Sequence, residues 1–202
     1  MMIPLLLLVF AYLLGGIPFG YLLVRFKTGE DIRSKGSGNI GATNVLRTTG
    51  RAFGVITLLL DIAKGALAVW LMGRATGNDI LWMSLAAVAV MLGHGFPIFL
   101  KFKGGKAVAS FIGAYLVLAP WPLLACLIVF VVIVAMTRYI SLGSILAAGL
   151  FPLAVWMILH PPLPLVLAAL FSGAFIVWRH RANIDRIRNG TEHVFRFGGE
   201  KA

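Results

Sequence analysis

A polar, glycine-rich stretch between two apolar segments is the part of this sequence best suited to bind an anion. It reads KGSGNIGATN over residues 35–44 and is followed by Arg47. Glycine lets successive backbone N–H groups turn toward one point, and such arrangements bind anions. Hydroxyl, amide and cationic side chains add donors and charge. The sequence therefore predicts a phosphate-binding loop that consists of Gly36, Ser37, Gly38, Asn39, Thr43, Asn44 and Arg47.

The glycine spacing of this loop also matches the GxGxxG pattern of dinucleotide-binding proteins. That pattern indicates a dinucleotide site only between a β-strand and the first helix of a βαβ unit. Here the loop follows a long apolar segment that predicts a membrane span, so we exclude a dinucleotide site. A solvated turn between two helices remains the alternative to a phosphate-binding loop.

A second cationic stretch with glycines follows the third apolar segment. It begins with His94 and ends with Gly104, Gly105 and Lys106, directly before another apolar segment. Flexible backbone and a cation at the start of a helix favour anion binding, because helix N-termini present N–H groups without helical partners. His94 is interpreted either as a packed, hydrogen-bonded side chain or as a residue of the site.

Two ionisable residues, Asp61 and Lys64, lie inside the second apolar segment. Their (i, i+3) spacing places them on one helix face. Charged groups at membrane depth are costly and therefore pair with each other or line a hydrated cavity. We keep two interpretations, a structural ion pair and a supporting role in anion binding.

A third group of polar residues lies toward the C-terminal end. The stretch after the last apolar segment contains His180, Asn183, Arg186 and Glu192, and Ser141 lies at the start of an earlier apolar segment. Alone, the C-terminal stretch is also typical of a basic helix that lies on anionic lipid. Together the three groups indicate a protein that handles one or two phosphorylated ligands at a membrane surface.

The composition indicates an integral membrane protein. Of the 202 residues 60% are hydrophobic and 12% are charged, whereas soluble domains are about half apolar and a quarter charged. We predict an all-α, polytopic helix bundle with seven transmembrane helices, with five as the alternative. Prolines at 120–122 and 161–164 favour seven, because proline interrupts helices. The apolar segments are 2–24, 52–73, 80–100, 107–119, 122–137, 142–159 and 163–178.

The distribution of basic residues predicts the orientation in the membrane. They concentrate in the connections 25–51 and 101–106, at Arg138 and from Arg179 onward, whereas the alternate connections contain only Arg74. Because basic loops face the cytoplasm, we predict an external N-terminus, a cytoplasmic C-terminus and a site on the cytoplasmic face. Both span counts are odd, so both agree with this orientation.

The remaining residues exclude several classes of site. A single cysteine, Cys126, excludes an intramolecular disulfide, and no zinc pattern is present. The net charge of +11 is carried by connections between apolar segments, which indicates anionic membrane partners instead of nucleic acid. We predict no metal, no cofactor, no nucleic acid and no obligate protein partner, and the lipid bilayer as surroundings.

The three polar groups resemble the signature stretches of one protein family. They are GSGNIGATN at 36–44 with Arg47, GHxFP at 93–97 with GGK at 104–106, and HRxNIxR at 180–186 with GxE at 190–192. In order and content they are similar to the bacterial acyl-phosphate-dependent glycerol-3-phosphate acyltransferases of the PlsY type, over nearly the whole chain. The resemblance implies one transmembrane acyltransferase domain, residues 1–202, in the bacterial cytoplasmic (inner) membrane.

The resemblance also implies an activity and roles for residues. An acyl group would pass from acyl phosphate to the 1-hydroxyl of glycerol 3-phosphate, giving lysophosphatidic acid and phosphate, the first step of bacterial phospholipid synthesis. The expected catalytic residues are then Ser37, Lys106, His180 and Asn183. Ser37, Arg47 and Lys106 would bind phosphate groups, and His180 and Asn183 would orient glycerol 3-phosphate. The other expected phosphate-binding residues are Gly36, Gly38, Asn39, Thr43, Asn44, Gly104, Gly105 and Ser141, with Asp61, Lys64, His94, Arg186 and Glu192 in support.

Two alternatives stay open at this stage. The hydroxyl proton is taken either by a phosphate oxygen of a substrate or by His94 or His180. A transporter or flippase for an organophosphate is the alternative function, although the inverted repeats typical of transporters are not found. A non-catalytic lipid-binding scaffold is a weaker alternative.

Overall fold

Segments that contact lipid must pair their backbone N–H and C=O groups internally, which favours helices over open strands. The computed structural model describes residues 2–195, and the regular structure within this range is entirely helical. The all-α prediction is therefore confirmed. Arg196 and Lys201, two cations of the predicted cytoplasmic tail, lie outside the described residues. The chain forms two compact units, divided between Leu118 and Ala119.

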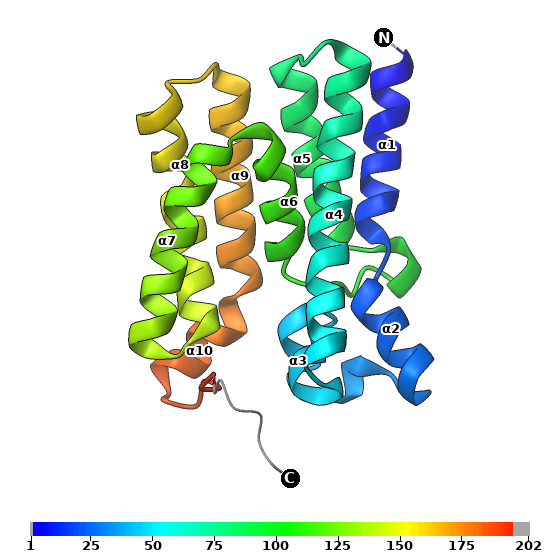
Figure 1. The fold of residues 1–202 in the computed structure, drawn as a ribbon, viewed down its shortest axis with the longest axis vertical. Coiled ribbons are helices and arrows are strands. Elements are labelled where there is room, and N and C mark those ends of the chain that lie inside the picture. Colours follow the sequence, from blue (N-terminus) through cyan, green and yellow to red (C-terminus); the bar gives the residue numbers. More distant parts are fainter. Residues whose placement is uncertain (1, 196–202) are drawn as a thin grey trace. The chain divides into compact units, whose positions relative to one another are not determined.

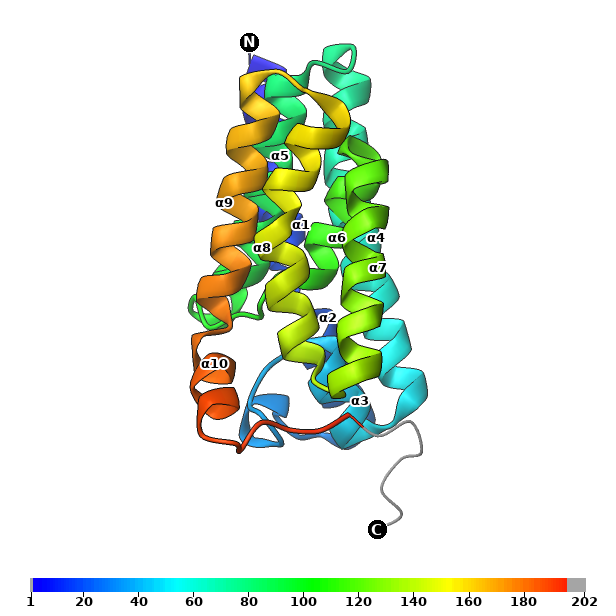
Figure 2. The same cartoon turned by 90° about the vertical axis from the view of Figure 1, so that its left-hand side faces the viewer.

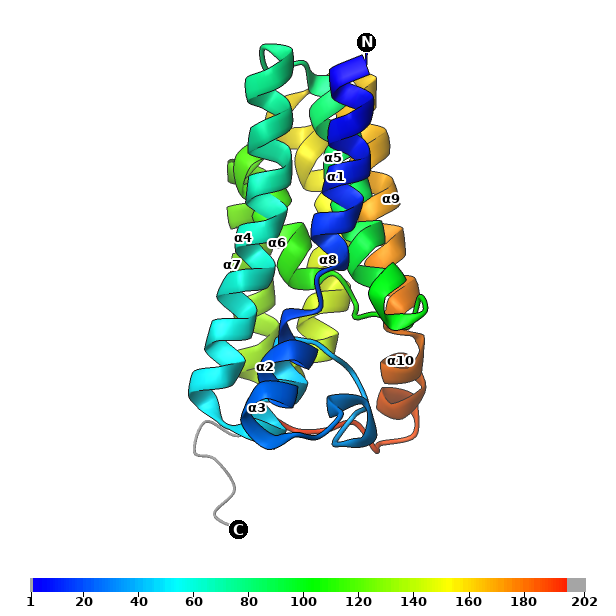
Figure 3. The ribbon, with the colours of Figure 1, turned by 90° about the vertical axis from the view of Figure 1, so that its right-hand side faces the viewer.

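The body of the first unit is a set of helices whose consecutive members run in opposite directions, with two short helices at the end where the longest one begins (Figure 1, Figure 3). The elements are α1 (Met2–Gly16), α2 (Phe19–Thr28), η1 (Ile32–Ser34), α3 (Ala42–Thr49), α4 (Arg51–Thr76), α5 (Ile80–Gly95), η2 (Ile98–Leu100) and α6 (Val108–Leu118). The short helices α2 and α3 and the loop between them form a polar end of this unit.

The first predicted span, residues 2–24, is interrupted between α1 and α2. Proline lacks the N–H that continues the helical ladder, and Pro18 has a non-helical backbone as the N-cap of α2. Close to this break, the carbonyl oxygen of Ile17 accepts a hydrogen bond of 2.8 Å from Nζ of Lys64 in α4. A side chain of a neighbouring helix therefore satisfies a carbonyl at the interruption, as membrane interiors require.

Glycines let the long helices of the first unit approach closely. A Cβ built on Gly15 of α1 would lie 2.1 Å from the carbonyl oxygen of Val90 in α5. In the same way, a Cβ on Gly113 of α6 would lie 1.8 Å from the carbonyl oxygen of Ile62 in α4. Such contacts are typical of membrane helices, which gain packing where small residues meet. Gly15 and Gly113 are therefore packing residues.

A small apolar core joins the loops at the polar end of the first unit. Its buried members come from α2, from η1, from the loop before α3, from α3 itself and from η2. They are Val24, Ile32, Ile40, Val45 and Leu100, with Tyr21 and Phe53 packed against them. Because Leu100 belongs to the loop after α5, Ile40 lies in the 35–44 loop and the other members flank that loop, one core fixes both cationic loops.

The second unit is a bundle of three long helices and one short basic helix (Figure 2). Its elements are α7 (Pro120–Thr137), α8 (Ile140–Leu159), α9 (Leu163–Arg179) and α10 (Arg181–Arg188). Proline at the first position of α7 starts that helix, since its missing N–H would have no partner there. The axes of α9 and α10 differ by 53°, so α10 leaves the direction of the bundle.

The number of membrane spans differs from the prediction. Within residues 2–195, five segments are long and apolar enough to cross a membrane, or six if the bent pair of α9 and α10 counts as one span. The predicted breaks at 120–122 and 161–164 are present, because α6 and α7, and α8 and α9, are separate helices. The remaining apolar helix, α6, has 11 residues and is about 16 Å long, against about 30 Å of bilayer core. Seven complete spans are therefore not confirmed.

Candidate functional site

The 35–44 loop is organised around the buried side chain of Asn44. Its Nδ2 donates hydrogen bonds to the carbonyl oxygens of Lys35 (3.0 Å) and Asn39 (2.8 Å). Its Oδ1 accepts a bond of 2.9 Å from the backbone N–H of Ser37. Gly36 allows this close approach, because a Cβ there would lie 2.3 Å from Oδ1 of Asn44. Asn44 therefore sits inside the loop, although the sequence alone suggested a side chain that faces the ligand.

Much of the backbone of this loop is bonded within the loop. The N–H groups of Ser37, Gly38, Gly41 and Asn44 all donate to oxygens inside the range 35–44. Some of the N–H groups that were predicted to converge on an anion are thus used in hydrogen bonds that stabilise the loop itself. Three side chains of the predicted set are exposed and face outward from the scaffold, namely Ser37, Thr43 and Arg47. The last two lie four residues apart on one face of α3.

Ion pairs flank the loop on its N-terminal side. Arg33 pairs with Asp31 at 2.6 Å, and Lys35 pairs with Glu30. The hydrogen bond from Arg33 lowers the pKa of Asp31, and the hydrogen bond from Lys35 lowers the pKa of Glu30. These pairs are exposed and add little stability. Lys35 is thus paired with Glu30, whereas the Arg47 side chain is exposed on α3.

The second cationic loop folds back onto the end of α5. The N–H of Gly105 donates to the carbonyl oxygen of His94 at 3.1 Å, and a Cβ on Gly105 would lie 2.2 Å from Nε2 of His94. A Cβ on Gly104 would lie 2.2 Å from the same carbonyl oxygen. Both glycines are therefore required by packing against His94. Lys106, the next residue, is half-buried directly before α6.

The backbone of this loop is strained at three residues that are not glycine. Lys101, Phe102 and Ala107 have φ values of +53°, +62° and +63°, in the left-handed region that side chains disfavour. Strain of this kind persists only where the surroundings impose it, and it concentrates at functional sites. Ala107 is fully buried beside Lys106, so the packing around it holds Lys106 in one backbone conformation.

Asp61, Lys64 and His94 form a buried ionisable cluster next to the second cationic loop. Nζ of Lys64 is 2.7 Å from Oδ1 of Asp61, and this oxygen is 3.6 Å from Nδ1 of His94. All three side chains are at most 5% exposed. The predicted pairing of Asp61 with Lys64 is confirmed. The separation of 3.6 Å exceeds a hydrogen bond, but it lets the carboxylate orient the imidazole electrostatically.

In the second unit, Glu192 collects hydrogen bonds from three predicted site residues. Its Oε1 accepts from Nδ2 of Asn183 at 2.7 Å and from Oγ of Ser141 at 2.9 Å. Its Oε2 accepts from Nε of Arg186 at 2.8 Å. Burial raises the pKa of Glu192, but the hydrogen bonds from Asn183, Ser141 and Arg186 outweigh it and lower the pKa. Glu192 is thus held as a carboxylate that joins α8, α10 and the segment after α10.

His180 lies at the junction of α9 and α10 and is almost fully buried. Its Nδ1 donates to the carbonyl oxygen of Ile176 at 2.8 Å. Because a carbonyl can only accept, this bond places the proton on Nδ1 and makes Nε2 the basic nitrogen of the neutral ring. His180 is therefore built as an oriented imidazole.

The structure also contains features that the sequence analysis missed. The hydroxyl of Tyr12 donates to the carbonyl oxygen of Phe96 at 2.7 Å and ties α1 to the start of the second cationic loop. One signal in the sequence was a tyrosine within an otherwise apolar segment. Among the described residues, no group of three or more His, Cys, Asp and Glu side chains could hold a metal ion.

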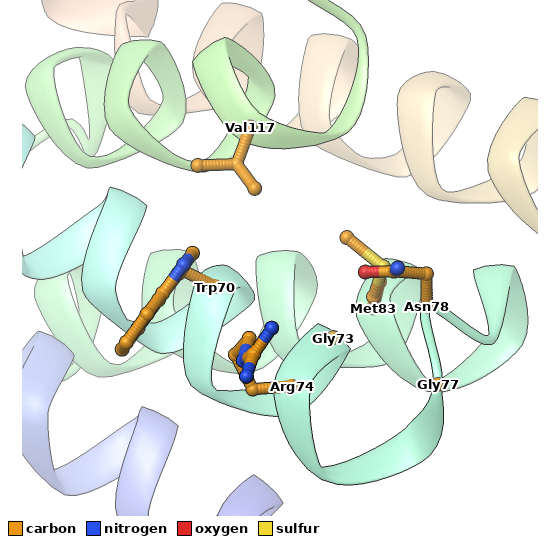
Figure 4. Close-up of a pocket in the computed structure, with 7 residues that line it drawn as sticks. All are labelled: Trp70, Gly73, Arg74, Gly77, Asn78, Met83 and Val117. Atoms are coloured by element: carbon orange, nitrogen blue, oxygen red, sulfur yellow. The ribbon is translucent and has the colours of Figure 1, made fainter.

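A pocket of about 310 Å³ lies at the other end of α4, where α4 and α5 connect (Figure 4). It contains Arg74, which the sequence identified only as the single cation of the less basic connections. The 26 residues of α4 span about 39 Å, so this pocket is far from the cationic loops at the start of α4. Its lining residues are Trp70, Gly73, Arg74, Gly77, Asn78, Met83 and Val117.

Comparison with known proteins gives one consistent result. Residues 5–190 match the family model described as glycerol-3-phosphate acyltransferase. A glycerol-3-phosphate acyltransferase of Geobacter sulfurreducens is 48% identical over 97% of this chain and 100% of its own, and one of Desulforamulus reducens is 47% identical over 95% and 94%.

Two crystal structures of PlsY, an integral membrane glycerol 3-phosphate acyltransferase, are similar to this chain. The glycerol 3-phosphate form is 39% identical, covers 96% of each chain and has a TM-score of 0.91. The lysophosphatidic acid form is 37% identical, covers 96% of this chain and 95% of its own, and has a TM-score of 0.87.

Proposed function

This chain belongs to the glycerol-3-phosphate acyltransferase family, and we infer that acyl phosphate is the donor in the reaction it catalyses. The protein is an integral membrane enzyme that acylates glycerol 3-phosphate to lysophosphatidic acid. Attack at the 1-hydroxyl, release of inorganic phosphate and a place at the first step of bacterial phospholipid synthesis are parts of the proposal. So is a single acyltransferase domain over residues 1–202.

One observation in the first unit carries the proposal of two phosphorylated substrates. Leu100 of the second cationic loop packs in the same buried core as Ile40 of the first loop and as Ile32 and Val45, which flank that loop. Two loops with exposed donors and cations are therefore held together at one end of the unit. A phosphate on the acceptor and a phosphate on the donor require two such loops, because each dianion needs its own charge-assisted donors.

In the first unit we assign phosphate binding to Ser37, Arg47 and Lys106. Ser37 and Arg47 are exposed on the scaffold that Asn44 holds, and Lys106 follows the glycines that pack on His94. Thr43 adds a hydroxyl on the same helix face as Arg47. Gly36, Gly38, Asn39, Asn44, Gly104 and Gly105 support this binding through the backbone conformation of the two loops.

In the second unit we assign the orientation of glycerol 3-phosphate to His180 and Asn183. The bond from Nδ1 to Ile176 fixes the imidazole of His180, and the bond to Glu192 fixes the amide of Asn183. Arg186 and Ser141 share Glu192 with Asn183, so they position the amide through that carboxylate. Ser141 then supports the site as part of this network, with phosphate contact as its alternative role.

The chemistry asks little of the protein, because acyl phosphate is already a mixed anhydride with a good leaving group. The hydroxyl oxygen attacks the acyl carbon, the bond from that carbon to the phosphate oxygen breaks, and its electron pair leaves with phosphate. The hydroxyl proton passes to a phosphate oxygen, or first to the imidazole of His180 or His94. The enzyme contributes juxtaposition of the substrates and stabilisation of the charge that develops on phosphate.

We place the protein in the bacterial cytoplasmic membrane with its cationic loops on the cytoplasmic face. The loop between α2 and α3 and the loop after α5 lie at the same end of the first unit (Figure 3). Seven passes follow if the short α6 counts as one, and they give an external N-terminus and a cytoplasmic C-terminus. Positive loops on the cytoplasmic side support this orientation.

Purified, reconstituted protein given glycerol 3-phosphate and palmitoyl phosphate tests the proposal. We expect release of inorganic phosphate in equal amount to lysophosphatidic acid, measured by phosphate assay and mass spectrometry. Propane-1,2-diol 1-phosphate, which lacks the 1-hydroxyl, should give neither product above background hydrolysis. EDTA should leave the rate unchanged. Turnover with palmitoyl-CoA but not with palmitoyl phosphate would refute the proposed donor.

A further inference from the structure

Lys64 does not face a ligand as a free cation would. Its Nζ donates to the carbonyl oxygen of Ile17 at 2.8 Å and pairs with Asp61 at 2.7 Å, and the side chain is 2% exposed. The ring of Phe19 lies 5.5 Å away, on the other side of the break between α1 and α2. A buried ammonium with these contacts is suited to positioning, because its contacts with Ile17 and Phe19 join α4 to the break at which α2 starts.

The start of α2 in turn determines where the first cationic loop lies. A Cβ built on Gly20 of α2 would fall 2.1 Å from the carbonyl oxygen of Ile40, so the helix backbone and the loop backbone touch. Val24, one turn further along α2, is buried in the same core as Ile40 and Val45. A shift of α2 at Ile17 would therefore move the 35–44 loop with it.

Asp61, the partner of Lys64, connects to the second cationic loop through His94. Its Oδ1 is 3.6 Å from Nδ1 of His94. Nε2, on the opposite side of the imidazole ring, packs against Gly105. The carbonyl oxygen of His94 also accepts a hydrogen bond from the N–H of Gly105. Lys106 is the next residue. The orientation of His94 by Asp61 therefore affects the backbone that presents Lys106.

We propose that the Asp61–Lys64 pair is a positioning device that sets the spacing between the two phosphate-binding loops. One helix, α4, carries both residues, so the (i, i+3) pair links Ile17 and α2 on one side with His94 and Gly105 on the other. A pair with no such role is easily replaced by apolar residues, since burying two charges costs as much as their attraction returns. This inference rests on the proposed function of the two loops.

The test replaces the pair without leaving a buried charge behind, by the double substitution Asp61→Asn with Lys64→Met. Thr57→Val is the matched control, because Thr57 is also buried on α4 and its hydroxyl bonds only to Phe53 of the same helix. KM and kcat are measured for glycerol 3-phosphate and palmitoyl phosphate, with thermal stability in parallel. Lys106→Gln identifies the substrate whose KM depends on Lys106.

We expect the double variant to raise the KM of that same substrate by about tenfold or more, with kcat within about threefold of wild type. Thr57→Val should leave both constants unchanged. An unchanged KM, with activity lost only in proportion to folded protein, would mean that the pair is a structural ion pair alone. A loss of kcat by about 100-fold at saturation, with loss of a pH-dependent limb, would make His94 the base and overturn the proposal.

A second variant tests the same connection from the other side and leaves the pair intact. Gly105→Ala introduces a methyl group 2.2 Å from Nε2 of His94, and we expect the same KM to rise. An unchanged KM in Gly105→Ala, in protein as stable as wild type, would refute the link between His94 and Lys106. Wild-type turnover tests the proposed function itself, so the two failures are distinguishable.

Discussion

At the scale of single residues, Arg47 and Lys106 differ from the other cations of the loops in their surroundings. Lys35 and Arg33 are paired with neighbouring carboxylates, whereas Arg47 is exposed on α3 and Lys106 follows a strained, glycine-containing backbone. Strain and packing at Ala107 hold Lys106 in one conformation. These two cations are therefore the ones suited to meet charge that develops on phosphate during transfer.

We expect Lys106→Ala and Arg47→Ala each to lower kcat/KM by about 10²–10³-fold. The loss corresponds to about 2.7–4 kcal/mol, the usual cost of removing one preorganised donor to developing negative charge. Lys101→Ala is the control, since Lys101 is an exposed cation of the same loop, and its effect should be milder. Phosphate release at subsaturating substrate gives the comparison. Wild-type activity in Lys106→Ala would place the phosphates elsewhere.

Asp185 tests whether an apparent motif has a function. The spacing of His180 and Asp185 matches a His–Asp catalytic pair of unrelated acyltransferases, but five residues on a helix separate side chains by about 140°. The structure places Asp185 on the exposed face of α10, and Nδ1 of His180 bonds to Ile176. We expect Asp185→Asn to keep most of its activity and His180→Ala and Asn183→Ala to lose it. An equal loss of activity in Asp185→Asn and His180→Ala would instead support a catalytic His180–Asp185 pair in which His180 is the base.

At the scale of elements, the first loop depends on one amide. A loop lacks the regular backbone hydrogen bonds of a helix or strand. Here three hydrogen bonds of the Asn44 side chain, to Ser37, Lys35 and Asn39, stabilise the loop instead. We expect Asn44→Ala to lower activity to less than about a tenth and to speed tryptic cleavage after Lys35, because the freed loop reaches the protease. Thr43→Ala, an exposed neighbour on α3, should weaken substrate binding with unchanged cleavage. A raised KM without faster cleavage in Asn44→Ala would make Asn44 a direct ligand.

The same loop shows what a sequence can and cannot predict. Residue types and spacing located the polar stretches and the predicted phosphate residues, because glycine, hydroxyl, amide and cation are chemical properties of the chain. The orientation of Asn44 could not be predicted, since an amide inside a loop and one facing a ligand have identical sequence. The bond from Ser141 to Glu192 joins residues 51 positions apart, a contact that arises only when the segment after α10 folds back to the start of α8.

The segment that carries Glu192 should depend on pH. The pKa of Glu192 is lowered from its ordinary value of 4.5, so the stabilisation that its bonds provide is complete above about pH 4.5 and is lost as pH falls through the lowered value. We expect faster amide hydrogen exchange in residues 189–195 only at pH below 4.5. Glu192→Gln, which cannot ionise, should exchange faster at neutral pH and show no such transition. A wild-type transition near neutral pH would contradict this assignment.

At the scale of the whole molecule, the count of passes determines the orientation of the chain. Composition predicted seven spans, yet in the part of the chain that the structure describes five segments, or six with the bent pair of α9 and α10, are long enough to cross a bilayer. The count of six lacks α6, which starts after the left-handed Ala107 and ends at Leu118, two residues before Pro120. A hydrophobic segment alone does not reveal such a shortened helix. Six passes would put both ends on one side, whereas α6 as a seventh pass separates them.

Cysteine labelling tests the short helix directly. Cys126 is the only cysteine, so Cys126→Ser provides a background for single substitutions. We expect Trp121→Cys, at the exposed start of α7, to react with a membrane-impermeant maleimide in intact cells, as Asn78→Cys should between α4 and α5. Ser34→Cys, at the end of η1 directly before the first cationic loop, should react only after permeabilisation, because basic loops face the cytoplasm.

Reporters at the two ends test the consequence of that short pass. A reporter fused after Ala202 should be cytoplasmic, and a tag placed before Met1 should be external. An odd number of passes requires this result, and the basic stretch after α9 favours a cytoplasmic tail. If Trp121→Cys reacts only after permeabilisation and both ends lie on one side, α6 returns to the face where it began. The seventh pass would then be wrong, and α7, α8 and α9 would each cross in the opposite direction.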